Sequence, residues 1–210
     1  MLITFEGIEG SGKSLQISRS EAYLQKKGIP YLSTREPGGT DFGVAIREIL
    51  LGTNGCRRLP WCELLLVMAD RYQHLKEVIE PALQQGLVVI SDRYLDATRA
   101  YQGGGRGIPL AEIEKLTRQL GIPEPDKTIL LDLDPEVGLS RARKRNLSDA
   151  SAGAEGRFEA EEMSFHRRVR ETYLKLAHQS PQRISIVPAS GTPEEIFSRI
   201  ERLLDAWTKS

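Results

Sequence analysis

Residues 7–14 read Gly-Ile-Glu-Gly-Ser-Gly-Lys-Ser, a complete G-x-x-x-x-G-K-S pattern. An apolar run at residues 2–5 precedes this stretch, and a helical pattern begins at Leu15. This order is typical of a phosphate-binding loop, because glycines let backbone N–H groups turn toward a polyphosphate and the helix adds the positive end of its dipole. The residues predicted to bind the nucleotide are Gly7, Ile8, Glu9, Gly10, Ser11, Gly12, Lys13, Ser14 and Leu15.

Two side chains of this phosphate loop (residues 7–14) have separate predicted roles. The ammonium group of Lys13 can reach the β- and γ-phosphates, and the hydroxyl of Ser14 can ligate a magnesium ion. The loop therefore predicts that a nucleoside triphosphate binds. It does not indicate what receives the phosphate.

The bulk composition is that of an ordinary globular protein. The 210 residues fit one domain, predicted over residues 1–210 with a lid segment at about 141–160. Lys plus Arg and Asp plus Glu both number 29, and this zero net charge argues against a general nucleic-acid binder, which is usually basic. Cys56 and Cys62 match no zinc or redox spacing and fit a reducing compartment. Without a membrane-length apolar run or a signal peptide, we expect a cytoplasmic protein.

Five apolar runs alternate with helical patterns along the chain. The runs cover residues 2–5, 30–33, 87–91, 128–133 and 184–187. The helical patterns cover about 15–27, 41–51, 61–84, 110–120, 135–144, 159–179 and 193–207, with caps expected at Asp134 and Thr192. This alternation predicts a three-layer α/β/α fold with a five-stranded parallel sheet and a helical lid. Ligands of such sheets bind beyond the carboxyl ends of the strands.

The stretch at 146–156 is small, polar and glycine-containing, so we expect it to be mobile. Arg141, Arg143, Lys144 and Arg145 precede it, and Arg157 follows. This is the composition of a lid that closes over phosphates. A solvated basic helix end followed by a disordered loop is the alternative.

Polar residues follow the second and third runs directly. Glu36 lies in Thr-Arg-Glu-Pro-Gly-Gly-Thr (34–40), where Pro-Gly-Gly predicts a tight turn. Asp92 and Arg93 end the third run, and an aspartate at this point is the usual second magnesium anchor. Asp132 is a rival, but the helix cap that follows it favours Asp92. The predicted metal ligands are Ser14, Asp92 and Glu36.

A second group of residues predicts a separate anion and base site. Thr98, Tyr101 and Gln102 share a helical face, and Gln102 carries both a donor and an acceptor for a nucleobase edge. We expect the glycines at 103–105 to end that helix. Arg47 and Arg71, together with Arg93, could form an anion site apart from the phosphate loop.

One triphosphate site and one monophosphate site together describe a nucleotide kinase, and here the chain closely resembles the bacterial thymidylate kinase family. The resemblance rests on residues 5–14, 34–40, 92–94, 100–107, 125–128 and 131–132, and it covers essentially the whole length. It implies phosphorylation of dTMP to dTDP with ATP and Mg²⁺. It also implies a homodimer. From the charge and composition, we expect no nucleic-acid or membrane partner.

The resemblance also implies roles for individual residues. Glu9 would lie near the deoxyribose 3′-hydroxyl, while Tyr101 would crowd the 2′ position. With Gly10 in the loop, a lid arginine, Arg157, would complete the catalytic set. The catalytic set consists of Lys13, Arg93, Arg157 and Glu9. The acceptor phosphate would be held by Arg47 and Arg93, with Glu36 and Pro37 beside it. Thymine would be read by Arg71, Thr98 and Gln102.

Two departures from the family pattern leave alternatives open. Val67 stands where the family usually has a phenylalanine that stacks on the base, so a kinase for another nucleoside monophosphate stays possible. The lid before Arg157 is longer than usual, so another lid arginine could act. A regulatory GTPase or ATPase switch is less favoured, because the chain lacks an Asn-Lys-x-Asp guanine motif.

Overall fold

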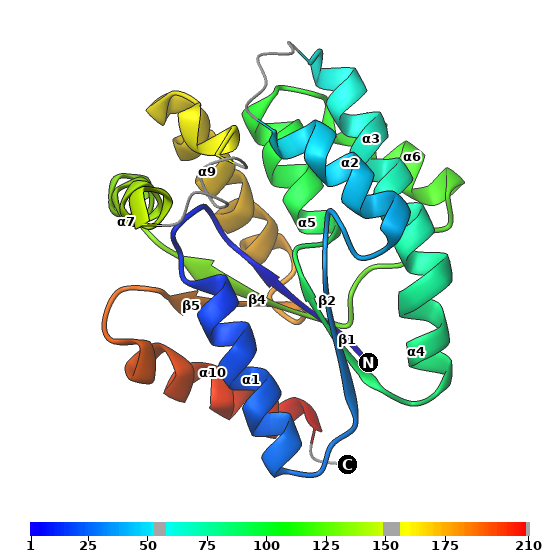
Figure 1. Cartoon of the computed structure of the whole chain (residues 1–210), viewed down its shortest axis with the longest axis vertical. Helices are drawn as coiled ribbons and strands as arrows, with labels where there is room; N and C mark the ends of the chain where they lie inside the picture. Colours follow the sequence, from blue (N-terminus) through cyan, green and yellow to red (C-terminus); the bar gives the residue numbers. More distant parts are fainter. Residues whose placement is uncertain (53–57, 149–155, 209–210) are drawn as a thin grey trace.

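The strands form at the predicted apolar runs. The computed structural model describes residues 1–52, 58–148 and 156–208 (Figure 1). Its parallel strands form one sheet in the order β2-β3-β1-β4-β5. Their bounds are β1 (Leu2–Glu6), β2 (Tyr31–Arg35), β3 (Val88–Asp92), β4 (Lys127–Asp132) and β5 (Ile184–Pro188). The predicted α/β fold class with its five-stranded parallel sheet is therefore confirmed.

Helices cover both faces of this sheet. Those of the described residues are α1 (Lys13–Lys26), α2 (Asp41–Leu51), α3 (Pro60–His74), η1 (Leu75–Ile79), α4 (Glu80–Gln84), α5 (Leu95–Thr98), η2 (Arg99–Gly105), α6 (Leu110–Gln119), α7 (Pro135–Ser148), η3 (Phe158–Ala160), α9 (Met163–Gln179) and α10 (Pro193–Thr208). Helices α1 and α10 lie together on one face, and α4, α5 and α9 lie on the other (Figure 1).

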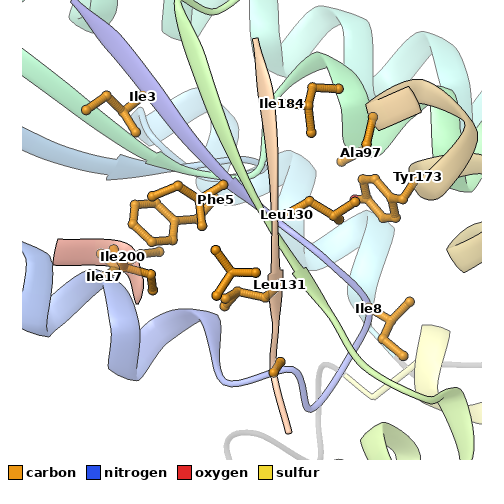
Figure 2. Packing of buried hydrophobic residues seen from close by; sticks show 14 of the residues in the cluster. Ile3, Phe5, Ile8, Ile17, Ala97, Leu130, Leu131, Tyr173, Ile184 and Ile200 are labelled. Carbon is orange, nitrogen blue, oxygen red and sulfur yellow. The ribbon is translucent and has the colours of Figure 1, made fainter. Parts of the chain in front are cut away.

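The core fills both faces because the central strands are apolar on both sides, apart from the buried hydroxyl residues Thr4, Ser91 and Thr128. Figure 2 shows Phe5 of β1 directed toward Ile17 of α1 and Ile200 of α10. On the opposite side, Leu130 of β4 lies near Tyr173 of α9. All five side chains are buried. At roughly 1.5–3 kcal/mol for each large apolar side chain, this burial holds β1, and thus the loop that follows it, in a fixed position.

Two predicted helices differ from the structure. The pattern at 61–84 predicts one regular helix, but the π-helical turn η1 separates α3 from α4. Pro81 lies just beyond this turn, and a wider turn accommodates a residue that cannot donate and whose ring crowds the carbonyl four residues earlier. The glycines at 103–105 are the last three residues of η2, which ends at Gly105 as predicted, but this segment is π-helical and not α-helical. They are small because α9 passes close by: a Cβ atom on Gly104 or Gly105 would collide with Thr172 or Phe165.

Helix ends follow the predicted caps, with two shifts. Asp134 Oδ1 accepts from the Glu136 N–H at 2.9 Å, and Thr192 Oγ1 accepts from the Glu195 N–H at 3.3 Å. Helix α7 extends to Ser148, beyond the predicted end at 144, because its last turn contains neither glycine nor proline. Helix α9 begins at Met163, not 159, after the short turn η3.

The predicted mobile stretch falls largely on residues 149–155, outside the described residues. Within the described ranges, no helix is both long and apolar enough to cross a membrane.

Candidate active site

A cavity of about 550 Å³ lies at the carboxyl edge of the sheet. It collects most of the predicted site residues from segments far apart in the sequence. Those that line it are Glu9, Gly10, Gly12, Lys13, Ser14, Leu15, Glu36, Pro37, Arg47, Val67, Arg71, Asp92, Arg93, Thr98, Tyr101 and Gln102. Gly7, Ile8 and Ser11 are buried residues of the loop that do not line the cavity, and Arg157 also lies outside the cavity lining.

The phosphate loop takes the conformation that its glycines predict. Gly7, Gly10 and Gly12 have φ angles of 139°, 71° and 89°, which L side chains rarely adopt. Lys13 turns back over the loop, and its Nζ donates to the carbonyls of Gly7 and Ile8 at 3.0 and 3.1 Å. Burial, together with the charge of nearby Arg93, lowers the pKa of Lys13 to about 8. An anion beside this ammonium group would favour its charged form.

The loop has no room for a side chain at position 10. A Cβ atom on Gly10 would collide with the backbone carbonyl of Gly138 at the start of α7. A second cation for a bound phosphate, in addition to Lys13, must therefore come from another segment.

Arg93 stands at the junction of the loop with the rest of the cavity. Its φ of 70° is unusual for a residue with a side chain, and such strain concentrates at functional sites. Its guanidinium donates to Glu9 Oε1 at 3.1 Å, to Tyr101 Oη at 3.0 Å and to the Gly7 carbonyl at 3.1 Å. Although burial opposes ionisation, His166, Arg93 and Lys13 together lower the pKa of Glu9 to about 2. Glu9 is therefore a fixed, ionised acceptor at the cavity wall.

The two candidate aspartates have different surroundings. Asp92 pairs in register with Phe5, next to the phosphate loop, and its buried Oδ1 accepts no hydrogen bond from a described residue. Asp132 is committed to Arg170 by two contacts of 2.7 and 2.9 Å. Asp92 and Ser14 both line the cavity, and an unpaired carboxylate oxygen together with a hydroxyl suits magnesium, which prefers oxygen ligands and keeps several waters. The donor set at Asp92 and Ser14 thus fits the predicted ion.

Glu36 is engaged in a buried ion-pair cluster. Its Oε2 accepts from Arg71 Nε at 2.7 Å, and its Oε1 lies 2.9 Å from His74 Nδ1. His74 Nε2 lies 2.7 Å from Thr34 Oγ1. With both oxygens committed, Glu36 positions Arg71, and this argues against the predicted magnesium ligation by Glu36.

The side chains predicted to read a base all line the cavity. Arg71 is 1% exposed and donates to Thr98 Oγ1 and to the Tyr94 carbonyl, both at 2.8 Å. Gln102 donates from Nε2 to Glu63 Oε1 at 2.8 Å. Val67 also lines the cavity, as predicted for the position where the family pattern has a phenylalanine.

The structure does not bring Arg157 into the cavity. Its guanidinium donates to Glu63 Oε2 at 2.5 Å and to the Leu50 carbonyl at 2.9 Å. Arg141 of α7 lines the cavity instead. Arg157 would have to leave a buried carboxylate to reach a phosphate, so the predicted catalytic role requires a movement that Arg141 does not need.

Three buried ionisable side chains near the site carried no prediction from the sequence. Glu6 accepts from the Tyr94 N–H at 2.8 Å, and burial and then the charge of Asp96 raise its pKa to about 7. A charge that ends an apolar strand was a usable signal for Glu6. Glu63 and His166 are fully buried. Neither had a usable sequence signal, because their partners are distant along the chain.

Comparisons with known proteins agree with this geometry. The thymidylate kinase family model matches residues 5–200. A thymidylate kinase of Nitratidesulfovibrio vulgaris (strain DSM 19637 / Miyazaki F) is 48% identical over 203 residues, 96% of this chain and 94% of that protein. One from Pelobacter propionicus (strain DSM 2379 / NBRC 103807 / OttBd1) is 50% identical over 200 residues, 94% of this chain and 90% of that protein. The crystal structure of thymidylate kinase from Ehrlichia chaffeensis superposes with a TM-score of 0.76 at 30% identity and 98% coverage of both chains. The chain therefore belongs to the thymidylate kinase family.

Proposed function

We propose that this protein transfers the γ-phosphate of ATP to dTMP and so forms dTDP for dTTP synthesis. One observation carries the proposal: a single cavity joins Lys13 of the phosphate loop to Arg47 and Arg93 on the acceptor side and to Gln102 beyond them. A donor phosphate and an acceptor nucleotide can thus meet in one cavity. Family membership agrees with this assignment.

The chain's own residues account for the chemistry. The acceptor is already a phosphate oxygen anion, so transfer requires position and charge more than a general base. Lys13 and Arg93 would neutralise the equatorial oxygens, and Arg47, held on the Pro37 carbonyl at 2.9 Å, would hold the acceptor phosphate. A magnesium ion held by Ser14 and Asp92 would neutralise further charge on the transferred group. Closure of the lid would exclude water and so limit ATP hydrolysis.

Glu9 and Tyr101 would select the sugar. The Tyr101 hydroxyl donates to Glu9 Oε1 at 2.5 Å, and the pair faces the cavity. Glu9 would accept from the 3′-hydroxyl, and the Tyr101 ring would leave no space for a 2′-hydroxyl. We therefore expect deoxyribose to be preferred over ribose.

An ATP-coupled assay with dTMP, dUMP, dCMP, dGMP and UMP tests the proposal. The expected result is the highest kcat/KM with dTMP. A better rate with another monophosphate would keep the kinase but remove the thymidylate assignment, which Val67 makes a real alternative. ATP hydrolysis without any dependence on monophosphate would favour a nucleotide-driven switch.

We also propose a homodimer formed through α2 and α3. Apolar side chains project from adjacent faces of these two helices: Phe42 is 52% exposed, Ile49 50%, Trp61 46% and Leu65 55%. Such a patch is typical of an interface. Light scattering should report a dimer that Leu65→Glu dissociates and Val137→Glu, on α7, leaves intact. A cytoplasmic location and the lack of a nucleic-acid partner stay predictions from composition.

A further inference from the structure

Glu63 of α3 is a charged residue that the proposed reaction does not use. It is 0% exposed and lies behind the cavity wall. Three donors converge on it: Gln102 Nε2 at 2.8 Å and Arg106 Nε at 3.2 Å on Oε1, and Arg157 Nη2 at 2.5 Å on Oε2. A buried carboxylate with this many donors is too costly to be incidental, because its ionised form must be compensated at every contact.

The ionised state of Glu63 is well supported by its surroundings. Burial acts against ionisation, but the charge of Arg106 and the hydrogen bonds from Gln102 and Arg157 lower the pKa of Glu63. An ionised carboxylate has no proton to donate, so it can only accept hydrogen bonds. It therefore dictates which end of the Gln102 amide faces it.

Gln102 has two ends with opposite hydrogen-bonding character. Its Nε2 is turned to Glu63, away from the cavity that the residue lines. Among the residues that the structure describes, none donates a hydrogen bond to Gln102 Oε1. The carbonyl oxygen, an acceptor, is thus the end left for a ligand.

We infer that Glu63 is a specificity-determining positioning residue, which locks the Gln102 amide with its oxygen toward the base so that the site accepts from a ring N–H. The inference rests on the proposed function, since it concerns the base of the acceptor nucleotide. Thymine and uracil carry a hydrogen on N3, which this oxygen can accept. Cytosine has a lone pair on N3, and two facing acceptors repel each other. Arg106 and Arg157 serve this role by holding Glu63 ionised.

The matched ligand pair for a test is dTMP and 5-methyl-dCMP. Both carry the same methyl group and ring shape, and they differ in the polarity of N3 and of the group at position 4. The measured quantity is the preference, the ratio of kcat/KM for dTMP to that for 5-methyl-dCMP. Damage that is only structural lowers both values and leaves the preference unchanged.

Glu63→Gln supplies a group that can donate or accept, so the Gln102 amide is free to turn over. We expect the preference for dTMP to fall at least ~10-fold in this variant, and to stay within about threefold of the parent in Glu63→Asp, which only accepts. When Glu63→Gln is added to Gln102→Ala, the preference for dTMP should not change further. If Glu63→Gln does not fold, Glu63→Ser replaces it, because a hydroxyl also donates or accepts and leaves room for water on the two arginines.

Three results would overturn the inference. They are an unchanged preference for dTMP in Glu63→Gln, an equal fall of this preference in Glu63→Asp, or a further fall when Glu63→Gln is added to Gln102→Ala. The proposed function fails separately, through absence of dTMP turnover in the parent protein. If the parent protein prefers dTMP and Glu63→Gln keeps that preference, only the role of Glu63 is refuted.

Discussion

The phosphate loop consists of consecutive residues, whereas the base pocket (Val67, Arg71, Thr98 and Gln102) draws its side chains from α3, α5 and η2. The loop presents backbone groups and one lysine that is held only by carbonyls and a hydroxyl of its own turn. In the base pocket, Arg71 is paired with Glu36, and Gln102 is bonded to Glu63. The loop therefore depends on local conformation, and the base pocket depends on charge pairs between distant segments.

This difference has a consequence for substitutions. A change in the loop removes a group that acts directly on phosphate and should leave the rest of the molecule intact. A change in the base pocket also leaves a buried partner without its counterpart, and an unsatisfied buried polar group costs about 1–3 kcal/mol. Substitutions in the base pocket should therefore change both ligand binding and the free energy of unfolding. Substitutions in the phosphate loop should change ligand binding alone.

Lys13→Ala should have the largest effect. The β- and γ-phosphates lose their point charge, so we expect a loss of at least ~3 kcal/mol of transition-state stabilisation, or more than ~100-fold in kcat/KM, with little change in the free energy of unfolding. Steady-state kinetics and urea unfolding measure the two quantities. Lys26→Ala, on the exposed side of the same helix, is the control. Near-normal turnover of Lys13→Ala would remove the phosphate-loop assignment.

Substitution of the two lid arginines, Arg141 and Arg157, should lower kcat to different extents. Arg141 lines the cavity while Arg157 is bound to Glu63, so Arg141→Ala should lower kcat by at least ~10-fold and Arg157→Ala by less. Arg143→Ala, with an exposed side chain on the same helix, is the matched control. A larger kcat loss in Arg157→Ala, with an unchanged KM for dTMP, would show that this side chain leaves Glu63 during turnover.

Arg71→Ala should raise the KM for dTMP at least ~10-fold, because a buried charged hydrogen bond is worth roughly 1.5–3 kcal/mol. It should also lower the free energy of unfolding, since Glu36 loses its guanidinium partner. Kinetics and urea unfolding of the same preparation test the coupling, with Arg202→Ala on exposed α10 as control. A KM effect with unchanged stability would contradict the contrast between pocket and loop.

Glu6, beneath the loop, should give the smallest effect, seen in the pH dependence of stability. Burial and then Asp96 raise the pKa of Glu6 from 4.5 to about 7, so the folded protein holds this proton more tightly than the unfolded chain. The stability that this contributes is complete below pH 4.5 and is lost as the pH rises through 7. Glu6→Gln stays neutral and should be the more stable form at about pH 8, by roughly 1–3 kcal/mol.

Urea unfolding at acidic and alkaline pH measures this difference, with exposed Glu201→Gln as control. A variant that is destabilised equally at both pH values would mean that the hydrogen bonds from Tyr94 and Tyr173 outweigh the charge of Glu6.

Much of the fold could be predicted because its signals are local. The five apolar runs and the caps at Asp134 and Thr192 depend on neighbouring residues, and the strands and the two capped helix starts form where these patterns predict. The π-helical form of η2 could not be predicted, since it is shaped by α9, which lies some sixty residues further along the chain and packs against Gly104 and Gly105.

By itself, the sequence determined the parallel α/β architecture, the phosphate loop and the family to which the chain belongs. The reason is that backbone conformation, helix capping and strand burial are governed by residues within a few positions of one another. Only the tertiary structure decided that Arg157 is bound to Glu63, that Glu36 supports Arg71 and that Gln102 turns its Nε2 to Glu63. These outcomes depend on which charged groups meet in a buried space, and such pairing is set by packing between segments tens of residues apart.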